Sequence, residues 1–557
     1  MKRVVAAVLS AALLTGCLAG CGDKSKGSDA DVNVKLSVWP PEMAQNFPSG
    51  QQTDPVMKKI EEKFNVTMDI DTHPTDEKFN VLLASNSLPD IVQTQAKYVQ
   101  RIIESDTAIP LDEYMEKLGT DITTNAPKAV EFSKENFSNG TNKLYFLPTQ
   151  VGEQSGASAI VGQFVRWDYY KELGYPEINS DDDWLNVVEQ MQKLHPTNED
   201  GEKVYGFSPW FDWDLWPYYM GGAFLTSYTY MLDGMLQIDR KTDEISSMIY
   251  DKENSLLWQG TKFWFKANQK GLLDPDALTQ KYDTAIQKGS TNKVLSSQAV
   301  WQTRDSNQVL KSAGYEDRGY ASMPIPRKNQ EYAVSNKEAG DANRMWFVNK
   351  SCKDPERAMQ ILNYLYSREG ANMIINGIEG VDFTVDNGKR KVTQQFLDTQ
   401  KNNPEWVGVT GATKYQNWCG LGTYYDWDKE NDEKLIISDR ETAIANMSPM
   451  DKDFCERYGV ELPGEYPEEK GVLVEDNTGM VTALLPETST DVKRTDDKIL
   501  SYLQSNLPKM ILASSEEEFN SLQDQIINEI KGMGYDEVYQ YHTTNYKEAL
   551  AKVKASE

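Results

Sequence analysis

One stretch of the sequence, residues 209–230, interleaves tryptophans with carboxylates (PWFDWDLWPYYMGGAFLTSYTY). Trp210, Trp213 and Trp216 are separated by aspartates and followed by a proline and a pair of glycines, which a buried helix would avoid. An indole ring can stack on the C–H face of a pyranose, while carboxylates accept hydrogen bonds from the sugar hydroxyls. The stretch therefore favours a sugar-binding cleft. The alternative is an aromatic core segment beneath a loop.

The balance of charges argues against two classes of partner. The 557-residue chain contains 58 Lys and Arg against 85 Asp and Glu, a formal net charge of −27. This excess of negative charge disfavours nucleic acid and adsorption of the protein surface to anionic lipid. It favours a neutral or non-acidic ligand, although a local basic pocket would not show in the sum. The length exceeds what one hydrophobic core usually serves, so two lobes or more are expected.

The sequence contains few residues from which a catalytic or metal-binding motif could be built. The three histidines, His73, His195 and His542, lie far apart in the sequence, so neither a His-based zinc site nor a Ser-His-Asp triad is expected. Each is interpreted as an ordinary loop or surface histidine. Residues 195–205 (HPTNEDGEKVY) lack the full Asp series of a calcium loop, so Asn198–Glu202 is expected to form a turn. We predict no metal, no cofactor and no enzymatic activity.

The first residues have the pattern of a bacterial lipoprotein signal. Lys2 and Arg3 precede the apolar run Val4–Leu14, which is too short to span a membrane. The sequences LTGC and LAGC, ending in Cys17 and Cys21, both resemble a lipobox, in which the chain is cut before a cysteine that becomes lipid-modified. Cys21 is the preferred site and Cys17 the alternative. Two acyl chains on that cysteine would hold the protein at a membrane.

The segment after the signal and the remaining cysteines have simpler interpretations. Residues 1–20 are expected to be the signal peptide and residues 21–35 a flexible, polar tether. Three further cysteines, Cys352, Cys419 and Cys455, belong to no CxxC motif. An odd number allows one disulfide at most, and all three are interpreted as structural.

Hydrophobic periodicity predicts an α/β unit at the start of the folded region. Alternating apolar residues predict strands over 32–38 and 66–70, and Pro55 begins a helix between them. This strand–helix–strand order implies a parallel pair. Ligands bind beyond the carboxyl ends of parallel strands. Strand-end residues are therefore predicted near one potential site: Trp39, Glu42, Thr94 and Gln95.

Further helices are marked by their capping residues. Ser180 with Asp183 has the pattern of a capping box. Asp354-Pro355 begins another helix, and the last long helix is expected at about 516–531.

Several segments, taken together and in order, resemble a known family. They are KLSVWP (35–40), LLASNSLPDIV (82–92), IPLDEY (109–114), NKLYFLP (142–148), FVRWDYYKELG (164–174), MPIP (323–326), DPERAMQILNYLYSREG (354–370) and GMGYDEVYQY (532–541). With the lipobox, they resemble the extracellular substrate-binding lipoproteins of carbohydrate ABC transporters, family 1 solute-binding proteins of the long variety. The resemblance implies two α/β lobes with a ligand cleft between them and several crossover segments. Lobe one would comprise residues 36–155 and 327–380, and lobe two residues 156–326 and 381–557.

The resemblance implies further binding residues. A tryptophan-bearing segment after the helix at 180 commonly faces the cleft in this family, which adds weight to Trp210, Trp213 and Trp216. Two more clusters, VWQTRDSN and YQNWCGLGTYYDWD, are candidate sites. Their candidate ligand-binding residues are Trp301, Arg304, Trp418 and Tyr424. For Arg166 and Asp168, a salt bridge near the hinge is preferred over ligand contact.

The resulting prediction is a monomeric, membrane-anchored sugar receptor on the extracytoplasmic face that closes around an oligosaccharide and passes it to permease subunits. No GxxxxGK[ST] loop is present, so the ATPase would be a separate chain. The alternatives are a binding protein for peptides or another small solute, a sensor accessory and, least favoured, a secreted glycoside hydrolase.

Overall fold

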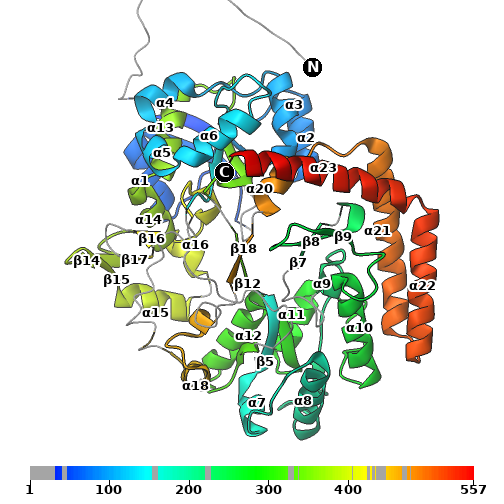
Figure 1. The fold of residues 1–557 in the computed structure, drawn as a ribbon. Coiled ribbons are helices and arrows are strands. Elements are labelled where there is room, and N and C mark those ends of the chain that lie inside the picture. Colours follow the sequence, from blue (N-terminus) through cyan, green and yellow to red (C-terminus); the bar gives the residue numbers. More distant parts are fainter. Residues whose placement is uncertain are drawn as a thin grey trace, which may run out of the picture.

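The fold is built around two mixed β-sheets joined by crossing segments (Figure 1). The computed structural model describes residues 32–40, 47–152, 161–219, 228–231, 233–315, 317–323, 332–335, 338–403, 405–422, 427–428, 433–434, 444, 447–466, 473–476 and 478–556. Strands and helices occur together in both halves of the molecule, which confirms the α/β class predicted from the sequence.

The first sheet has the strand order β2-β1-β3-β13-β4. Its strands are β1 (Val34–Trp39), β2 (Val66–Ile70), β3 (Ile91–Thr94), β4 (Leu147–Thr149) and β13 (Asp341–Val348). β1 is parallel to β2 and to β3, as the strand–helix–strand pattern predicts. β13, which comes from much later in the chain, is antiparallel to both β3 and β4.

Helix α1 (Pro55–Phe64) connects β1 to β2 and begins where the sequence predicts. The Asp54 carboxylate accepts a hydrogen bond from the backbone N–H of Met57 at 2.9 Å, which satisfies one of the free donors of the first turn. Val56 and Ile60 lie on the buried face of the helix. Asn65, with φ of 48°, ends it in the left-handed region.

The second sheet has the order β11-β5-β10-β6. Its strands are β5 (Val161–Arg166), β6 (Tyr205–Phe207), β10 (Val294–Ala299) and β11 (Tyr320–Met323). Its core includes buried residues of helices α8 (Asp181–Leu194), α10 (Leu256–Gln269), α21 (Thr490–Ile511) and α22 (Glu516–Gly532). The Ser180 side chain caps α8 by accepting from the N–H of Asp183 at 3.1 Å, as predicted.

The chain passes between the two sheets more than once. It leaves the first sheet after Thr149 and joins the second at Val161, then returns between Met323 and Asp341. A parallel pair, β12 (Tyr332–Ser335) and β18 (Leu473–Asp476), lies between the sheets (Figure 1). The division into lobes stays a prediction. The predicted division assigns residues 415 and 418 to lobe two, but both pack in the core of the first sheet.

The C-terminal region contains one helix more than the sequence predicts. α22 corresponds to the expected last helix, but α23 (Tyr535–Ser556) follows it after Gly534. α23 runs from the α21–α22 pair towards α20 (Thr478–Ala483), which contacts β13 of the first sheet (Figure 1). The expectation that α22 is last was wrong: the buried residues Tyr535, Val538, Tyr546, Ala549 and Val553 follow helical spacing, but His542 interrupts this stripe and polar residues surround it.

The expectation of a loop or surface position was also wrong for His542. This residue lies on α23 and is 5% exposed. Its Nε2 is 2.7 Å from Oδ2 of Asp496 on α21, and Asp496 Oδ1 accepts from the N–H of Gly234 at 3.0 Å. The partner lies 46 residues away in the sequence, so no local pattern reveals the pair.

Among the described residues, no helix combines the length and apolar character needed to cross a bilayer. The cysteines Cys352, Cys419 and Cys455 are buried, and none of them forms a disulfide with another described residue.

Candidate functional site

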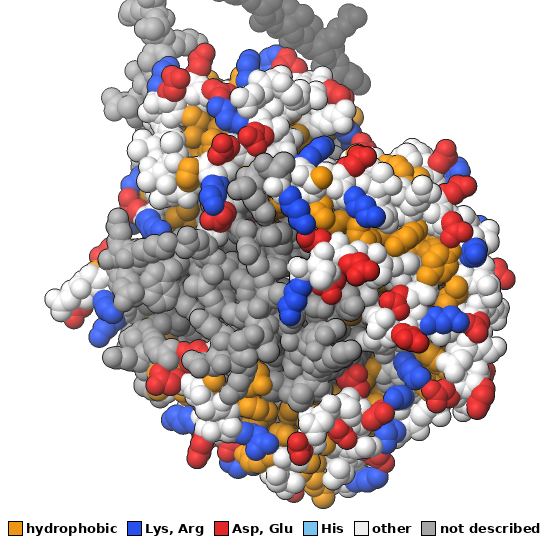
Figure 2. All heavy atoms as spheres, in the orientation of Figure 1, with side chains coloured by type: hydrophobic (Ala, Val, Ile, Leu, Met, Phe, Trp, Pro, Cys, Tyr) orange, Lys and Arg blue, Asp and Glu red, His pale blue; other side chains and the backbone are white. Residues whose placement is uncertain are grey.

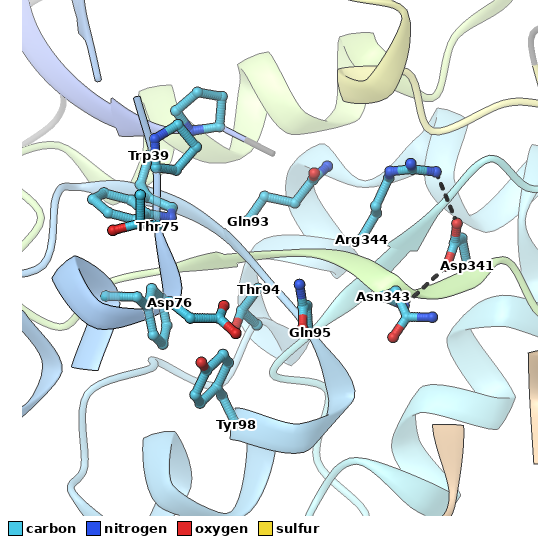
Figure 3. Close-up of a pocket in the computed structure, with 13 residues that line it drawn as sticks. Trp39, Thr75, Asp76, Gln93, Thr94, Gln95, Tyr98, Asp341, Asn343 and Arg344 are labelled. Carbon is cyan, nitrogen blue, oxygen red and sulfur yellow. Dashed lines mark hydrogen bonds and ion pairs between the residues drawn. The ribbon is translucent and has the colours of Figure 1, made fainter. Parts of the chain in front are cut away.

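A pocket of about 380 Å³ opens at one edge of the first sheet (Figure 3). This volume falls in the range of small-molecule sites. Its lining residues are Trp39, Pro40, Pro74, Thr75, Asp76, Phe79, Gln93, Thr94, Gln95, Tyr98, Asp341, Asn343 and Arg344. Trp39 and Gln95 are two of the predicted binding residues, and the structure brings them to this one pocket.

The position of the pocket follows from the directions of three strands. β1 ends at Trp39 and β3 ends at Thr94, and because the two are parallel both carboxyl ends meet at the same edge. β13 runs in the opposite direction, so its first residue, Asp341, lies at that edge as well. Helix α2 (Asp76–Ala84), capped by the Thr75 side chain, begins beside them.

Two buried polar atoms in the pocket lack a hydrogen-bond partner. Gln93 and Thr94 are each 4% exposed, and no partner for Gln93 Oε1 or Thr94 Oγ1 exists within the part of the chain that the structure describes. Gln93 Nε2, by contrast, donates to the backbone carbonyl of Asn417 at 3.1 Å. An unsatisfied buried polar atom costs about 1–3 kcal/mol. Both residues line the pocket.

Aromatic rings form one wall of the pocket. The Phe79 ring lies 5.9 Å from Trp39 and 4.6 Å from Tyr98, measured between centroids. The Lys78 ammonium lies 5.5 Å from the Trp39 ring. Burial raises the pKa of Tyr98, and Asp76 raises it further against the opposing effect of Lys97. Tyr98 therefore carries a neutral hydroxyl at physiological pH.

Charged side chains at the pocket are matched by opposite charges. Arg344 Nη1 donates to Asp341 Oδ2 at 3.0 Å, and Asp341 Oδ1 accepts from the N–H of Asn343 at 2.9 Å (Figure 3). Asp76 forms an ion pair with Lys97.

The aromatic stretch at 209–219 forms a second group. Trp210, Trp213 and Trp216 gather with Tyr282 at centroid distances of 4.7–5.8 Å. Trp213 stacks on Tyr282 with an angle of 26° between the rings. Trp216 begins the short helix α9 (Trp216–Tyr219), and Tyr282 begins α11 (Tyr282–Ser290).

The three tryptophans differ in exposure. Trp210 is fully buried, although its indole N–H has no partner among the described residues, whereas Trp213 is 39% exposed. Trp216 is half-buried. The segment therefore combines both interpretations that its sequence left open: one ring is core and another is available for stacking.

Trp418 lies in the core rather than in the pocket. It is 2% exposed, with its ring 5.5 Å from that of Trp346, and its carbonyl accepts from Trp346 Nε1 at 3.0 Å. The proposed ligand contact at Trp418 stays a prediction. The burial agrees with a packing role.

The remaining predicted binding residues can be placed only in part. Trp301 and Arg304 belong to helix α12 (Val300–Ser312), but their side chains are outside the described residues. Cys21, Glu42 and Tyr424 also lie outside the residues that the structure describes.

Two local predictions near the second sheet are confirmed. Arg166 is buried and donates to both carboxylate oxygens of Asp168, at 2.9 and 2.7 Å. Residues 198–202 form a turn, because Asn198 Oδ1 accepts from the N–H groups of Asp200 and Glu202 at 3.1 and 2.9 Å. The Glu202 carboxylate is paired with Lys293 at 2.7 Å. No cluster of three or more acidic, histidine or cysteine ligands occurs among the described residues.

Sequence reasoning missed most of the pocket wall. The missed residues that carry polar groups are Thr75, Asp76, Gln93, Tyr98, Asp341, Asn343 and Arg344. Thr94 was predicted because it ends a strand, but the same signal did not identify Gln93, the residue before it. Asp341–Arg344 would have been found only by knowing that β13 enters the first sheet antiparallel to β3.

Comparison with known proteins agrees with this architecture. The sequence model of a family described as bacterial extracellular solute-binding protein matches residues 48–372. The chain belongs to this family. The resemblance predicted from the sequence is therefore confirmed. The family is one of binding proteins rather than enzymes, so the glycoside hydrolase alternative is not supported.

Individual relatives are distant. The fructooligosaccharide ABC transporter substrate-binding protein FusA of Streptococcus pneumoniae serotype 4 is 21% identical over 343 residues, which span 57% of this chain and 60% of that protein. The crystal structure of alginate-binding protein AlgQ2 without calcium ion has a TM-score of 0.58 at 16% identity, covering 93% of this chain and 98% of that one. The structure of S. pneumoniae FusA in complex with kestose also has a TM-score of 0.58, at 14% identity, and the match covers 93% of this chain and 100% of that one. These likenesses show a periplasmic-binding-protein-like fold.

Proposed function

We propose that the chain is a membrane-anchored, extracytoplasmic receptor for an oligosaccharide, which it delivers to the permease of an ABC importer by closure of two lobes. The observation that carries the proposal is the pocket at the edge of the first sheet. Gln93 and Thr94, whose Oε1 and Oγ1 have no partner among the described residues, line the same pocket as the rings of Trp39 and Tyr98. Apolar rings next to unsatisfied hydrogen-bonding atoms suit a sugar, which has an apolar C–H face and a rim of hydroxyls.

Two further observations support this function. Trp213 supplies a partly exposed ring on the side of the second sheet, so a chain of several sugar units would have aromatic surfaces in both lobes. The relative with the printed name of fructooligosaccharide ABC transporter substrate-binding protein belongs to a transport system, which agrees with delivery to a permease. Closure of the lobes would bury the ligand and create the form that the permease recognises.

The binding proposal is tested by titrating the full chain, purified in detergent, with a panel of neutral and acidic oligosaccharides while recording tryptophan fluorescence and heat. We expect saturable binding of at least one sugar without hydrolysis products. Thr94→Val, which removes the hydroxyl at nearly constant volume, should weaken that binding roughly three- to tenfold. Thr384→Val, at an exposed position of strand β14 (Phe383–Asp386), is the matched control. Binding of peptides in place of sugars would contradict the proposed ligand.

The anchor proposal needs a separate experiment, because Cys21 lies outside the described residues. In cells fed labelled palmitate, Cys21→Ser should abolish both the label and the membrane fraction of the protein, whereas Cys17→Ser should leave both unchanged. The reverse pattern would assign the anchor to Cys17. Membrane association of the double variant would contradict lipid anchoring.

A further inference from the structure

We infer that the first-sheet pocket selects uncharged sugars and rejects acidic ones, such as oligomers of uronic acids. This inference rests on the proposed function and names the class of ligand within it. It is carried by the pairing of every charged side chain that lines the pocket. These side chains are Asp76, Asp341 and Arg344.

Among the described residues that line the pocket, Arg344 is the only cation, and one of its N–H groups already donates to a carboxylate of the chain. Its Nη1 lies 3.0 Å from Asp341 Oδ2, three residues earlier on the same strand. Asp341 is itself held in place, because its other oxygen accepts from the N–H of Asn343 at 2.9 Å. A ligand carboxylate would therefore compete with a carboxylate that is part of the chain and is already positioned.

The opposite wall is also unfavourable to an anion. The beginning of helix α2 faces the pocket, and the dipole of a helix favours negative charge at that end. However, Asp76 and Glu77 occupy the first turn, so the helix end already has its negative charge. Two described cations on this side, Lys97 and Lys78, form ion pairs with Asp76 and Asp71. A carboxylate entering the pocket would meet these acidic groups, and every cation named here among the described residues already has a carboxylate partner.

The unsatisfied atoms of the pocket, by contrast, match hydroxyl groups. Gln93 Oε1 is an acceptor, and Thr94 Oγ1 can both donate and accept. A sugar hydroxyl can donate to Gln93 Oε1, and it can either donate to or accept from Thr94 Oγ1. A carboxylate is an acceptor only, so at this position it would leave Gln93 Oε1 without a partner, and a uronate could satisfy that atom only through one of its hydroxyls.

The net charge of the protein also disfavours acidic ligands, and it does so at longer range. The net charge of −27 lowers the local concentration of anionic ligands around the protein. On the face shown in Figure 2, Lys and Arg side chains are interspersed with Asp and Glu over the described surface.

The test compares two probes of equal length, the neutral trisaccharide kestose and the acidic trisaccharide trigalacturonate. Neutral trisaccharides of other linkages accompany kestose, and uronate trisaccharides of other linkages accompany trigalacturonate. Titrations use the full chain in detergent at low and at moderate salt. We expect the best neutral sugar to bind at least about a hundredfold more tightly than the best uronate, with little change with salt. Equal or tighter binding of a uronate would overturn the inference while leaving the proposed sugar-binding function intact. Failure of every sugar to bind would overturn both.

A substitution tests the mechanism directly. Asp341→Asn keeps the side-chain shape and the acceptor for Asn343 but releases the Arg344 guanidinium. We expect this variant to gain uronate affinity by about tenfold, a gain that disappears in the double variant with Arg344→Gln. Asp386→Asn, which removes an exposed carboxylate at the end of strand β14, is the control for the change in net charge. If Asp341→Asn folds, as judged by its melting curve, and gains nothing, the role assigned to the Asp341–Arg344 pair is wrong. If it does not fold, the comparison of probes on the natural chain decides the inference.

Discussion

Gln93 Nε2 donates a hydrogen bond to the backbone carbonyl of Asn417 at 3.1 Å, across 324 residues of sequence. The Oε1 atom of the same side chain is buried and has no partner in the described structure. Gln93 thus joins the pocket to the segment around Asn417, which packs on the first sheet. Figure 3 shows its amide group lying between Trp39 and Arg344.

The first prediction concerns this residue. Gln93→Leu keeps most of the volume but removes the acceptor that faces the ligand. We expect sugar affinity to fall roughly three- to tenfold, because one neutral hydrogen bond contributes about 0.5–1.5 kcal/mol. Calorimetric titration with the best sugar of the panel measures the change. Gln395→Leu, at an exposed position on α15 (Gln394–Asn402), is the control. Unchanged affinity in Gln93→Leu would remove Gln93 from the binding site.

The second prediction separates the two roles within the aromatic group. Trp210 is fully buried, so Trp210→Ala should lower the free energy of unfolding by about 3–5 kcal/mol. Trp213 is 39% exposed, so Trp213→Ala should cost much less stability. Because its ring is available for stacking, however, that variant should bind sugar roughly three- to tenfold more weakly.

Urea unfolding and sugar titration of the same two variants distinguish these effects. Trp213→Phe keeps an aromatic face and should recover most of the affinity. If Trp213→Ala binds as tightly as the natural chain, the stretch at 209–219 is only structural.

Local sequence patterns predicted much of the fold because they report interactions between near neighbours. Asp54 and Ser180 cap the helices that follow them, and alternation of apolar residues identified β1 and β2. Arg166 and Asp168 are two residues apart, so their salt bridge was also visible in the sequence. In each of these cases the partner is close along the chain.

The site was predicted less well because its residues come from distant segments. Trp39 and Gln95 were found through the general rule that ligands bind at strand ends. Asp341 and Arg344 reach the pocket only because β13 joins the sheet some 250 residues after β3. Trp418 is a tryptophan, a residue that often stacks on sugars, and only its contact with Trp346 reveals that it is buried.

The third prediction concerns a buried ion pair that joins Lys414 to Asp54, the residue that caps helix α1. Lys414 Nζ lies 2.9 Å from Asp54 Oδ2, with exposed side-chain fractions of 4% and 0%. Asp54→Ala would leave the Lys414 ammonium buried without its carboxylate, so we expect the free energy of unfolding to fall by about 3–5 kcal/mol.

Removing the other partner, Lys414, should lower the free energy of unfolding by less. In Lys414→Met, Asp54 keeps the hydroxyl of Tyr415 at 2.5 Å and the N–H of Met57 at 2.9 Å, so its charge stays partly satisfied. The exposed pair Lys59–Glu62 serves as the control, since Lys59→Met should cost less than about 1 kcal/mol. Urea unfolding of the three variants provides the comparison. Equal losses for Asp54→Ala and Lys59→Met would contradict the argument.

The fourth prediction concerns the buried thiols and alkaline pH. Burial raises the pKa of Cys352 to about 12 and, with the nearby Asp451 and Glu465 carboxylates, that of Cys455 to about 11. In the unfolded chain both thiols ionise near about pH 8.5. The folded state therefore holds protons that the unfolded state releases. The contribution of each thiol is fully present below about pH 8.5 and is lost as the pH rises towards the folded pKa.

Between pH 8.5 and 9.5 this loss should amount to about 1 kcal/mol for each thiol. The buried tyrosines add a further loss as they begin to ionise in the unfolded chain, and the double variant described next shares that loss. Urea unfolding at pH 7.5, 8.5 and 9.5 measures it. The double variant Cys352→Ala with Cys455→Ala should be less stable at neutral pH, because two buried side chains are truncated, but should lose about 2 kcal/mol less over the alkaline interval. The same thiols should react slowly with iodoacetamide at pH 8 in the folded protein and rapidly in denaturant, as mapped by mass spectrometry. An identical pH dependence in the natural chain and the double variant would show that these thiols stay protonated, or ionise, equally in both states.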